Sequence, residues 1–432
     1  MARCPTTRHS HAPWGVALSE AAGQAAGRHA PEPLTILRDP ATIRERSAAI
    51  TRAVSEGRSS FFMLDRARLD DTASLVESVT RAAYPELRIP YHSRWRHFEA
   101  GGVDRKRELD ALLAGRSPAE QARARVDLTV VSVLLDAGAG ARWKYVDADS
   151  GQTFSRSEGL AVASLRAFVR GAFSSQRDDP LRVDAATLRR LDAGALKEMF
   201  QASAGNPLIG LESRAALLNR LGNALPSDAP GDEARPGSLF DRLTQRGERT
   251  QIAAADVLRA LLEAFSSIWL TGSVLHGVPL GDVWPHPFAG GHSTTAGWVP
   301  FHKLSQWLAY SLLEPFEWAG VSVTGLDALT ALPEYRNGGL LLDTGVIVPR
   351  DARLVARIWK PADPFVIEWR ALTVSLIDEL APLVRERLGR SAEQMPLACL
   401  LEGGTWAAGR QIAKELRDGS PPLAIDSDGT VF

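Results

Sequence analysis

The feature that most constrains the fold is a helix start followed by a long apolar run. Ser117-Pro118-Ala119-Glu120 is a capping box, because the serine oxygen and the glutamate carboxylate can each satisfy an amide that the helix leaves free. Residues 126–141 then contain only two charged side chains, Asp127 and Asp136, and Gly138 predicts the end of the helix. A helix that is apolar on most sides has to be buried, so the sequence predicts a helical body packed around this segment.

Helical spacing of apolar residues recurs along most of the chain. Asp39-Pro40 offers an N-cap followed by a proline at the first helical position, and Gly57 follows the last apolar residue in phase. Strand-like alternation appears only at residues 339–348 and 423–432, where Asp428-Gly429 resembles a turn. We therefore expect a mainly α fold with small β-hairpin elements. The expected helices span residues 40–56, 67–83, 117–136, 157–172, 186–201, 211–224, 254–268, 301–318, 365–388 and 406–417.

Composition along the chain indicates the domain organisation. Residues 1–36 are rich in Ala, Gly, Pro, His and Arg without an apolar period, so we expect a disordered lead-in rather than a signal peptide. Residues 37–432 are expected to form a single globular domain, since few stretches resemble linkers. The Pro- and Gly-rich residues 226–238 are either an internal boundary or a surface loop.

Charge and cysteine content argue against several functional classes. Lys and Arg total 50 and Asp and Glu total 51, so the formal charge is −1 and no excess of cations is available for nucleic-acid phosphates. The apolar run at residues 126–141 falls short of the roughly 20 apolar residues that span a bilayer. Cys4 and Cys399 are the only cysteines and lie at opposite ends of the chain, which fits a reducing cytoplasm. We expect a cytoplasmic protein that binds neither nucleic acid nor membrane.

Common catalytic motifs and metal-ligand patterns are absent from the sequence. It contains no Gly-x-Ser-x-Gly elbow, no Walker loop and no His-Glu-x-x-His, and Gly138-Ala139-Gly140 fits a helix end better than a dinucleotide fingerprint. His286, His292 and His302 lie near Asp282, but their spacing matches no ligand motif. We expect neither a metal nor a cofactor.

Three polar and aromatic segments are candidates for a site. The first, residues 91–99, interleaves His92 and Arg94 with rings such as Trp95, which can cover a sugar or a planar leaving group. The same pattern is expected of a solvated loop whose rings pack inward. On the sequence alone, a ligand site and a solvated loop are equally supported.

The second segment, residues 300–310, places a lysine in an apolar and aromatic helix. Lys303, Trp307, Tyr310 and Glu314 follow steps of 4, 3 and 4 residues and so share one helix face. Burying an ammonium is costly unless an anion pairs with it. A lysine near a helix start can also extend its ammonium to solvent, and the sequence alone favours this simpler explanation.

The third segment, residues 332–339, combines a carboxylate, a phenol, a guanidinium, an amide and a glycine pair. Loops of this kind often line sites, although Asn337-Gly338 also fits a turn before the expected strand at residues 339–348. A separation of 334 − 303 = 31 residues allows a helix and its return loop to bring Lys303 and Glu334 together. The polar residues of this segment are Glu334, Tyr335, Arg336 and Asn337.

Five longer strings carry a resemblance to a known family. They are IPYHSRWRHF at residues 89–98, SEGLAVAS at 157–164, FHKLSQW at 301–307, LPEYRNGG at 332–339 and LEGGTWAAGR at 401–410. With these strings, the chain from about residue 37 to 432 resembles an uncharacterised family of fungal and bacterial proteins associated with uracil catabolism through ribosylurea. The resemblance implies a pathway in which uracil becomes its nucleotide, a cyclohydrolase-like protein opens the ring and urea is finally released. Other enzymes of that pathway are the expected partners.

Two of these strings show a further resemblance. FHKLSQ at residues 301–306 and Glu334-Tyr335-Arg336 are similar in order and spacing to the lysine-containing helix and the Asp-Tyr-Arg motif of the queuosine-salvage nucleoside glycosylases. Those enzymes are themselves similar in fold to helical DNA glycosylases, so the resemblance implies a helical body of that type. Glu334 stands where that motif has an aspartate, which puts the reach and role of the carboxylate in question.

Together the resemblances imply cleavage of the N-glycosidic bond of ribosylurea, as its 5'-phosphate, to urea and ribose 5-phosphate. Glu334 would stabilise the oxocarbenium-like centre and orient a water. Lys303 would hold Glu334 ionised or donate to the departing urea. A Schiff base formed by Lys303 ranks lower, because a neighbouring carboxylate keeps the amine protonated.

The same resemblance implies where substrate contacts lie. Arg336, Arg94 or the amides of a helix expected to begin near Thr405 would bind a phosphate. Aromatic residues at helical spacing belong to the core about twice as often as to a site, so the role of the rings as pocket walls is weighed against that alternative. The expected contacts are His92, Arg94, Trp95, His302, Trp307, Tyr310, Tyr335, Arg336 and Asn337.

Three other functions stay open at this point. A ureide amidohydrolase or deaminase needs a nucleophile beside a base, and only Lys303 and Glu334 suggest such a pair. A non-catalytic partner would bind a pathway intermediate without turnover. A nucleic-acid glycosylase fits the fold analogy but not the balanced charge.

Overall fold

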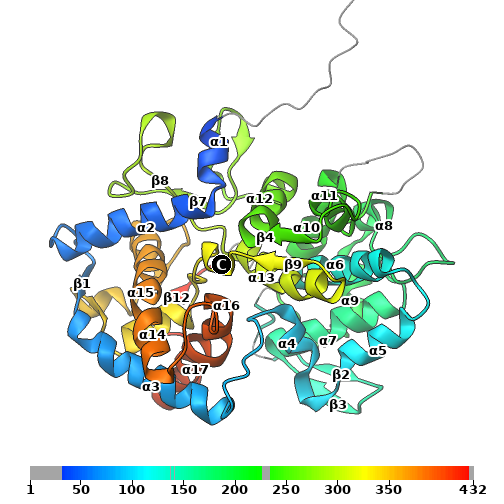
Figure 1. Cartoon of the computed structure of the whole chain (residues 1–432), viewed down its shortest axis with the longest axis horizontal. Coiled ribbons are helices and arrows are strands. Elements are labelled where there is room, and N and C mark those ends of the chain that lie inside the picture. The colour runs from blue at the N-terminus through cyan, green and yellow to red at the C-terminus, as the bar shows by residue number, and fades with distance from the viewer. Residues whose placement is uncertain (1–31, 137, 141, 226–233, 428–432) are drawn as a thin grey trace, which may run out of the picture.

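Helices form most of the structure, a computed structural model that describes residues 32–136, 138–140, 142–225 and 234–427. They account for 55% of it, which confirms the mainly α fold class (Figure 1). The expected likeness to helical DNA glycosylases stays a prediction. Residues 1–31 of the expected lead-in lie outside the described part, whereas Glu32–Leu37 forms a short helix, α1.

One half of the molecule brings together elements from the two ends of the chain. α15 (Pro364–Leu388) packs against α2 (Pro40–Ser55) and α3 (Leu69–Ala83). α14 (Asn337–Asp343) packs against α17 (Trp406–Arg417) and α15. These helices lie together on the left of Figure 1, coloured blue and orange to red. Helices from the beginning and from the end of the described chain therefore pack on each other.

The other half comes from the middle of the chain and is organised around α6 (Pro118–Leu134). The predicted capping box is confirmed: the Glu120 amide donates to Ser117 Oγ at 3.3 Å, and the Ser117 amide donates to the Glu120 carboxylate at 3.0 Å. Residues 124–135 are buried, as the apolar run predicts. α6 packs against α7 (Arg156–Val169) and α13 (Lys303–Trp318), and one continuous apolar core joins the two halves.

Shorter helices complete the described part of the chain. None of its helices combines the length and the apolar character that a membrane span requires. The remaining helices are α4 (Arg94–Phe98), α5 (Arg105–Leu112), α8 (Ala185–Arg190), α9 (Ala193–Met199), α10 (Leu211–Ala224), α11 (Ser238–Leu243), α12 (Ala254–Phe265) and α16 (Leu397–Leu400).

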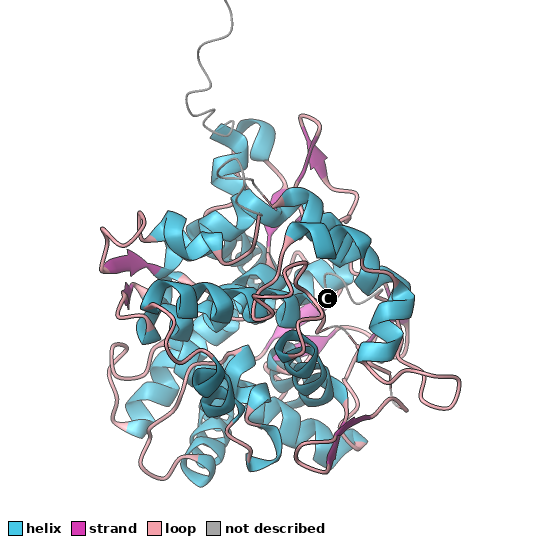
Figure 2. Ribbon diagram, turned by 90° about the vertical axis from the view of Figure 1, so that its right-hand side faces the viewer, coloured by secondary structure: helices cyan, strands magenta, loops and turns pink. Residues whose placement is uncertain are grey.

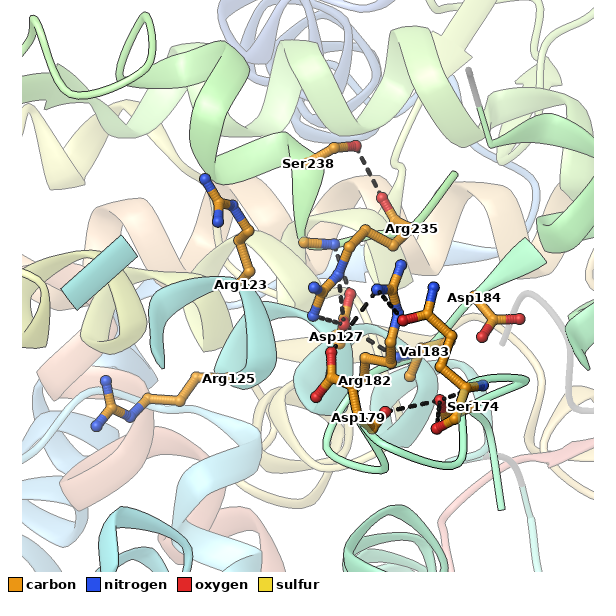
Figure 3. A network of polar contacts seen from close by, with 12 residues as sticks. Arg123, Arg125, Asp127, Ser174, Asp179, Arg182, Val183, Asp184, Arg235 and Ser238 are labelled. Carbon is orange, nitrogen blue, oxygen red and sulfur yellow. Dashed lines mark hydrogen bonds and ion pairs between the residues drawn. The ribbon is translucent and has the colours of Figure 1, made fainter. Parts of the chain in front are cut away.

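A fully buried carboxylate in α6 fastens two loops to that helix (Figure 3). Asp127 Oδ1 accepts the Gly237 amide at 2.6 Å, and Oδ2 accepts the Val183 amide at 3.0 Å. Arg235 donates to the same Oδ2 through Nε at 3.0 Å and also through Nη2. Part of the candidate boundary at residues 226–238 is therefore tied to the core, while residues 226–233 lie outside the described part.

The strands are short and scattered, and they outnumber the two strand segments expected from the sequence (Figure 2). Two of the six strand pairs in the described part of the chain, β4–β9 and β11–β12, are parallel, and several pairs join segments far apart in sequence. The pairs are β1 (Phe62–Leu64) with β10 (Ile347–Pro349), β2 (Tyr145–Asp147) with β3 (Gln152–Phe154), β4 (Gln251–Ala253) with β9 (Ser322–Thr324), β5 (Val274–Leu275) with β6 (Val278–Pro279), β7 (Val283–Pro285) with β8 (Trp298–Pro300), and β11 (Ile358–Trp359) with β12 (Ala424–Ile425).

Only the first part of the C-terminal hairpin expected over residues 423–432 lies within the described residues. Ala424–Ile425 pairs in parallel with the distant segment Ile358–Trp359. The expected turn at Asp428-Gly429 lies outside the described residues.

The strand expected over residues 339–348 is wrong, because residues 337–343 form α14. Gly338 packs so tightly on α15 that a Cβ atom would lie 2.5 Å from the Trp369 ring, and Trp369 Nε1 donates to its carbonyl at 3.1 Å. The glycine therefore serves helix packing and not the turn that the sequence suggested. Only residues 347–349 of this region are extended.

The single helix expected over residues 186–201 is divided into α8 and α9. Leu191 adopts an extended backbone, with φ −66° and ψ 125°, and Asp192 accepts the Ala195 amide at 2.8 Å as the N-cap of α9. An N-cap residue needs a non-helical backbone, so the aspartate that starts α9 also ends the continuity with α8.

Candidate active site

A cavity of about 440 Å³ lies where the two halves meet around the start of α13. The middle of the chain contributes Asp136 and residues 138–140 after α6, together with the first turn of α7. The other half contributes residues 334–336, Trp406 of α17 and residues 419–421. Segments distant in sequence therefore converge on one concave surface, as ligand sites generally require.

Glu334 is the carboxylate that the fold fixes most firmly at this cavity. Its Oε2 accepts the Arg336 amide at 2.8 Å and its Oε1 accepts the Asn337 amide at 2.7 Å, so it caps α14. The residue is only 7% exposed. Burial raises the pKa of the Glu334 carboxyl, while the two amides and the charge of Lys303 oppose that shift.

Lys303 lines the same cavity from the first position of α13. The helix begins two residues later than expected, because His302 has a left-handed backbone with φ 48°. The Lys303 amide donates to Asp282 Oδ2 at 2.9 Å, which anchors the helix start. Burial lowers the pKa of the Lys303 amine, and the nearby Glu334 and Asp136 carboxylates oppose this. The structure thus places Lys303 and Glu334 on one cavity, with opposite charges that attract each other.

A second carboxylate, Asp136, faces the cavity from the end of α6. Its Oδ2 forms an ion pair with Arg94 Nη1 at 3.1 Å, and both side chains are almost fully buried. Arg94 also donates through Nε to Ser132 Oγ at 2.7 Å and through Nη1 to the Ser157 carbonyl at 3.2 Å. Arg94, expected to contact substrate directly, therefore lies behind the wall and holds Asp136.

Tyr335 and Arg336 form the rim next to Glu334. The Arg336 guanidinium lies 4.7 Å from the centre of the Tyr335 ring and donates to the Gly419 carbonyl at 3.3 Å. Tyr335 is 39% exposed, so its ring faces the opening. The cation of Arg336 is the closest one to Glu334 in sequence that also lines the cavity.

His92 and His97 lie on the boundary with an adjoining cavity of about 700 Å³, which both also line. His92 Nδ1 is 2.6 Å from Glu402 Oε2, and its ring lies 5.8 Å from that of Trp406. The His97 ring stands perpendicular to the Trp307 ring at 5.8 Å. Burial, followed by the charge of Arg94, lowers the pKa of His97 to about 3, so the ring is neutral.

Besides Arg94, four further expected contacts do not line the cavity, because their polar atoms are occupied elsewhere in the fold. Trp95 Nε1 donates to the Ser311 carbonyl at 3.2 Å, and Tyr310 Oη donates to the Thr330 carbonyl at 3.0 Å. His302 Nε2 lies 2.9 Å from the Leu37 carbonyl, and Asn337 Nδ2 donates to the Leu332 carbonyl at 3.1 Å. Trp95 and Tyr310 are core residues, the alternative that helical aromatic spacing favoured. The helix face expected to unite Lys303, Trp307, Tyr310 and Glu314 brings only Lys303 and Trp307 to the cavity.

The helix expected to begin near Thr405 offers no free amides for a phosphate. α16 continues into α17 through a widened helical turn at residues 401–405, so the amides at that point belong to one helical run. Thr405 Oγ1 donates to Asn337 Oδ1 at 2.8 Å and ties this run to α14.

The histidines near Asp282 serve separate structural roles. Asp282 pairs with Arg370 at 2.7 Å, and His286 Nε2 lies 3.7 Å from Glu368. Within the described ranges, no three His, Cys, Asp or Glu side chains gather as a metal site would need.

Among the charged residues that line the cavity, sequence reasoning missed Asp136 and Arg156. His97 lay within the candidate segment at residues 91–99 but was not named as a contact. Arg156 has a left-handed backbone, with φ 55°, where the chain enters α7 between the two cavities. The one signal available for Asp136 was a charge at the end of an otherwise apolar helix. No local pattern distinguished Arg156 from surface residues.

Comparison with known proteins places this architecture among relatives of nearly equal length. The chain is 39% identical over 399 residues to Protein urg3 of Schizosaccharomyces pombe, covering 90% of this chain and 96% of that protein. It is 38% identical over 437 residues to Uracil catabolism protein 4 of Lachancea kluyveri, covering 93% of this chain and 99% of that protein. A family model described as a protein of unknown function, DUF1688, matches residues 36–432. The chain therefore belongs to this family, which includes uracil-catabolism proteins of fungi.

Proposed function

We propose that this protein acts in uracil catabolism as an N-ribosyl hydrolase that converts ribosylurea 5'-phosphate and water to urea and ribose 5-phosphate. The pathway is supported by relatives of nearly full coverage, one of which is named a uracil catabolism protein. The reaction is supported by one observation above all: a buried carboxylate, Glu334, is held by two backbone amides at a cavity that it shares with a lysine.

The carboxylate suits a bond that breaks with positive charge on the sugar. As the anomeric carbon loses its bond to nitrogen, the electron pair leaves with the urea and an oxocarbenium-like centre develops. A fixed negative charge stabilises this centre without reorganisation, and it can orient the water that attacks. The water supplies hydroxide to the anomeric carbon, and its remaining proton passes to Glu334.

Lys303 fits the role of proton donor to the leaving nitrogen. Urea departs as a neutral molecule only if its nitrogen gains a proton as the bond breaks. Burial lowers the pKa of the Lys303 amine, which makes the ammonium a better acid than a solvated lysine. The proton that Glu334 collects from water restores the ammonium, so the cycle closes.

Release of urea from ribosylurea and its 5'-phosphate tests the proposal. Wild-type protein should release urea, and Glu334→Gln should reduce kcat by about 100-fold or more, since it removes the stabilising charge. Lys303→Ala should reduce kcat with a smaller change in KM. Glu368→Gln and Lys106→Ala are matched controls, because neither side chain lines the cavity. A folded wild-type protein that releases no urea, or a Glu334→Gln variant with wild-type turnover, would contradict the proposal.

A non-catalytic binding partner is the outcome to recognise in the same experiment. It would bind one of the two compounds without releasing urea from either.

The 5'-phosphate compound should be the better substrate, because Arg336 and Arg156 line the cavity as cations that an anion can reach.

A further inference from the structure

Several polar atoms around the cavity have no hydrogen-bond partner among the described residues. Trp307 Nε1 and Arg94 Nη2 are donors of this kind, and Asp136 Oδ1 is an acceptor. His97 Nδ1 is a further unpartnered atom. Buried polar groups are nearly always paired in folded proteins, so an unpaired group at a cavity indicates that a ligand completes it. A concentration of them on one cavity is difficult to explain by packing alone.

Three of these side chains, His97, Asp136 and Trp307, line the cavity, and Arg94 lies directly behind them. We term these four side chains the polar wall. Arg94 is its centre, since its Nη1 lies 3.1 Å from Asp136 Oδ2 and its guanidinium carbon lies 5.7 Å from the centre of the Trp307 ring. His97 extends the wall on the other side of Trp307, with ring centres 5.8 Å apart. The Asp136 carboxylate and the Trp307 ring therefore lie next to the same guanidinium, and each carries one unpartnered polar atom.

The unpartnered atoms restrict the chemistry of the group that they can bind. An indole N–H only donates and a carboxylate only accepts, so the ligand group must carry an acceptor and an N–H or O–H donor close together. A phosphate does not satisfy this requirement, because it would present negative charge to Asp136. A neutral ureido group does, since its carbonyl accepts from Trp307 and its N–H groups donate to Asp136.

Sugar hydroxyls also combine a hydrogen-bond donor with an acceptor. The location of the wall distinguishes a ureido group from them. Trp307 lies about one turn after Lys303 on α13, and both line the cavity together with Asp136, so the wall stands beside the lysine. Lys303 is the proposed proton donor to the departing nitrogen. The part of the ligand beside Lys303 is then the leaving group, and the sugar extends from there toward Glu334.

We infer that the polar wall binds the ureido end of the ligand. Asp136 accepts hydrogen bonds from the ureido N–H groups, Trp307 donates to the ureido carbonyl, and Arg94 positions Asp136. The inference rests on the proposed function for the identity of the ligand, and it adds the residues that determine specificity. Asp136 and Trp307 contact the ligand, whereas Arg94 acts through Asp136.

Calorimetric binding tests this assignment in a Glu334→Gln background, where turnover is suppressed. Two ligands are compared, ribosylurea 5'-phosphate and ribose 5-phosphate, because their affinities differ by the ureido contribution. Trp307→Phe and Asp136→Asn should each weaken binding of ribosylurea 5'-phosphate by about 10- to 100-fold, since each leaves a polar group of the ligand unpaired. Binding of ribose 5-phosphate should stay within about twofold.

Trp143→Phe is the matched control for the indole substitution. Trp143 is buried and donates to the Phe200 carbonyl at 2.9 Å, away from the cavity. It should change neither affinity. Should Asp136→Asn fail to fold because Arg94 loses its anion, Trp307→Phe still decides the question.

The outcomes separate the inference from the proposed function. Equal weakening of both ligands, or no weakening of either, would overturn the inference, since the wall would then read the sugar or nothing. Selective weakening in a protein that releases no urea would support the inference and contradict the hydrolase. Binding of neither ligand by the folded protein would overturn both.

Discussion

Two aspartates 136 − 127 = 9 residues apart, one within α6 and one just after its end, show how differently this protein treats a buried negative charge. Asp127 has both oxygens occupied, by two amides and by Arg235. Asp136 has one oxygen paired with Arg94 and the other without a partner among the described residues. The first arrangement is complete and fastens loops to the core. The second is incomplete and faces a cavity, which is what a recognition group needs before its ligand arrives.

The largest effect is expected when Asp127, the carboxylate whose two oxygens are both occupied, is replaced. Asp127→Ala should lower the free energy of unfolding by about 3 to 5 kcal/mol, because it leaves the Arg235 charge and two amides unpaired. Guanidinium chloride unfolding followed by circular dichroism measures this. A loss below about 1 kcal/mol would contradict the structural role assigned to Asp127.

A third buried carboxylate, Glu368, extends the comparison to the pH dependence of the free energy of unfolding. Glu368 accepts from Ser59, with His286 3.7 Å away, and burial raises the pKa of its carboxyl to about 7. The folded state therefore holds this proton more tightly than the unfolded state, so stability from this group is lost as pH rises from about 4.5 to 7. Over that window the loss is about 2 to 3 kcal/mol.

Glu368→Gln isolates that contribution, since the amide does not titrate. The variant should show a flatter dependence of unfolding free energy on pH, and it should exceed wild type in stability at pH 8. Chemical denaturation at pH 5, 6, 7 and 8 makes the comparison. Parallel curves for the two proteins would show that Glu368 is ionised in the fold.

The indole pair tests whether an unpartnered donor lacks a structural role. Trp143→Phe should destabilise the protein by about 1 to 3 kcal/mol more than Trp307→Phe, because only Trp143 loses a hydrogen bond and leaves a buried carbonyl unpaired. Thermal unfolding of the two variants gives the difference directly. Equal losses would mean that the Trp307 N–H has a partner in the folded protein without ligand.

The smallest effect concerns the start of the helix that leads to both aspartates. Ser117→Ala removes the cap at the N-terminus of α6 and should cost about 1 kcal/mol. Urea release and ligand affinity should be unchanged, because the cap lies at the opposite end of the helix from Asp136. An effect on affinity as large as that of Asp136→Asn would show that the two ends of α6 are coupled.

Local signals explain which parts of the fold could be predicted from the sequence. The capping box at Ser117 and Glu120 and the proline start of α2 depend on neighbouring residues, so their helices were expected within a few residues of their bounds. α14 could not be predicted in the same way. It depends on the contact of Gly338 with Trp369, which lies 31 residues further along the chain.

The candidate site divides along the same line. Lys303 and Glu334 were found because a lysine in an apolar helix and a motif-like carboxylate stand out in the sequence, and both line the cavity. Trp95 and Tyr310 stood out for the same kind of reason but belong to the core. Asp136 became visible only in the fold, through its place at the cavity and its unpartnered oxygen, which depend on how distant segments meet.

The assembly of the cavity from segments between residues 92 and 421 has a consequence for the protein's dynamics. A ligand that contacts both halves opposes their separation, since the halves cannot move apart while the ligand stays bound to both. At a concentration of 100 times Kd, occupancy would add about 2.7 kcal/mol to the cost of any opening that destroys the cavity. Amide hydrogen exchange should therefore slow on ligand binding in α6, α13 and α17 together, although these helices lie far apart along the chain.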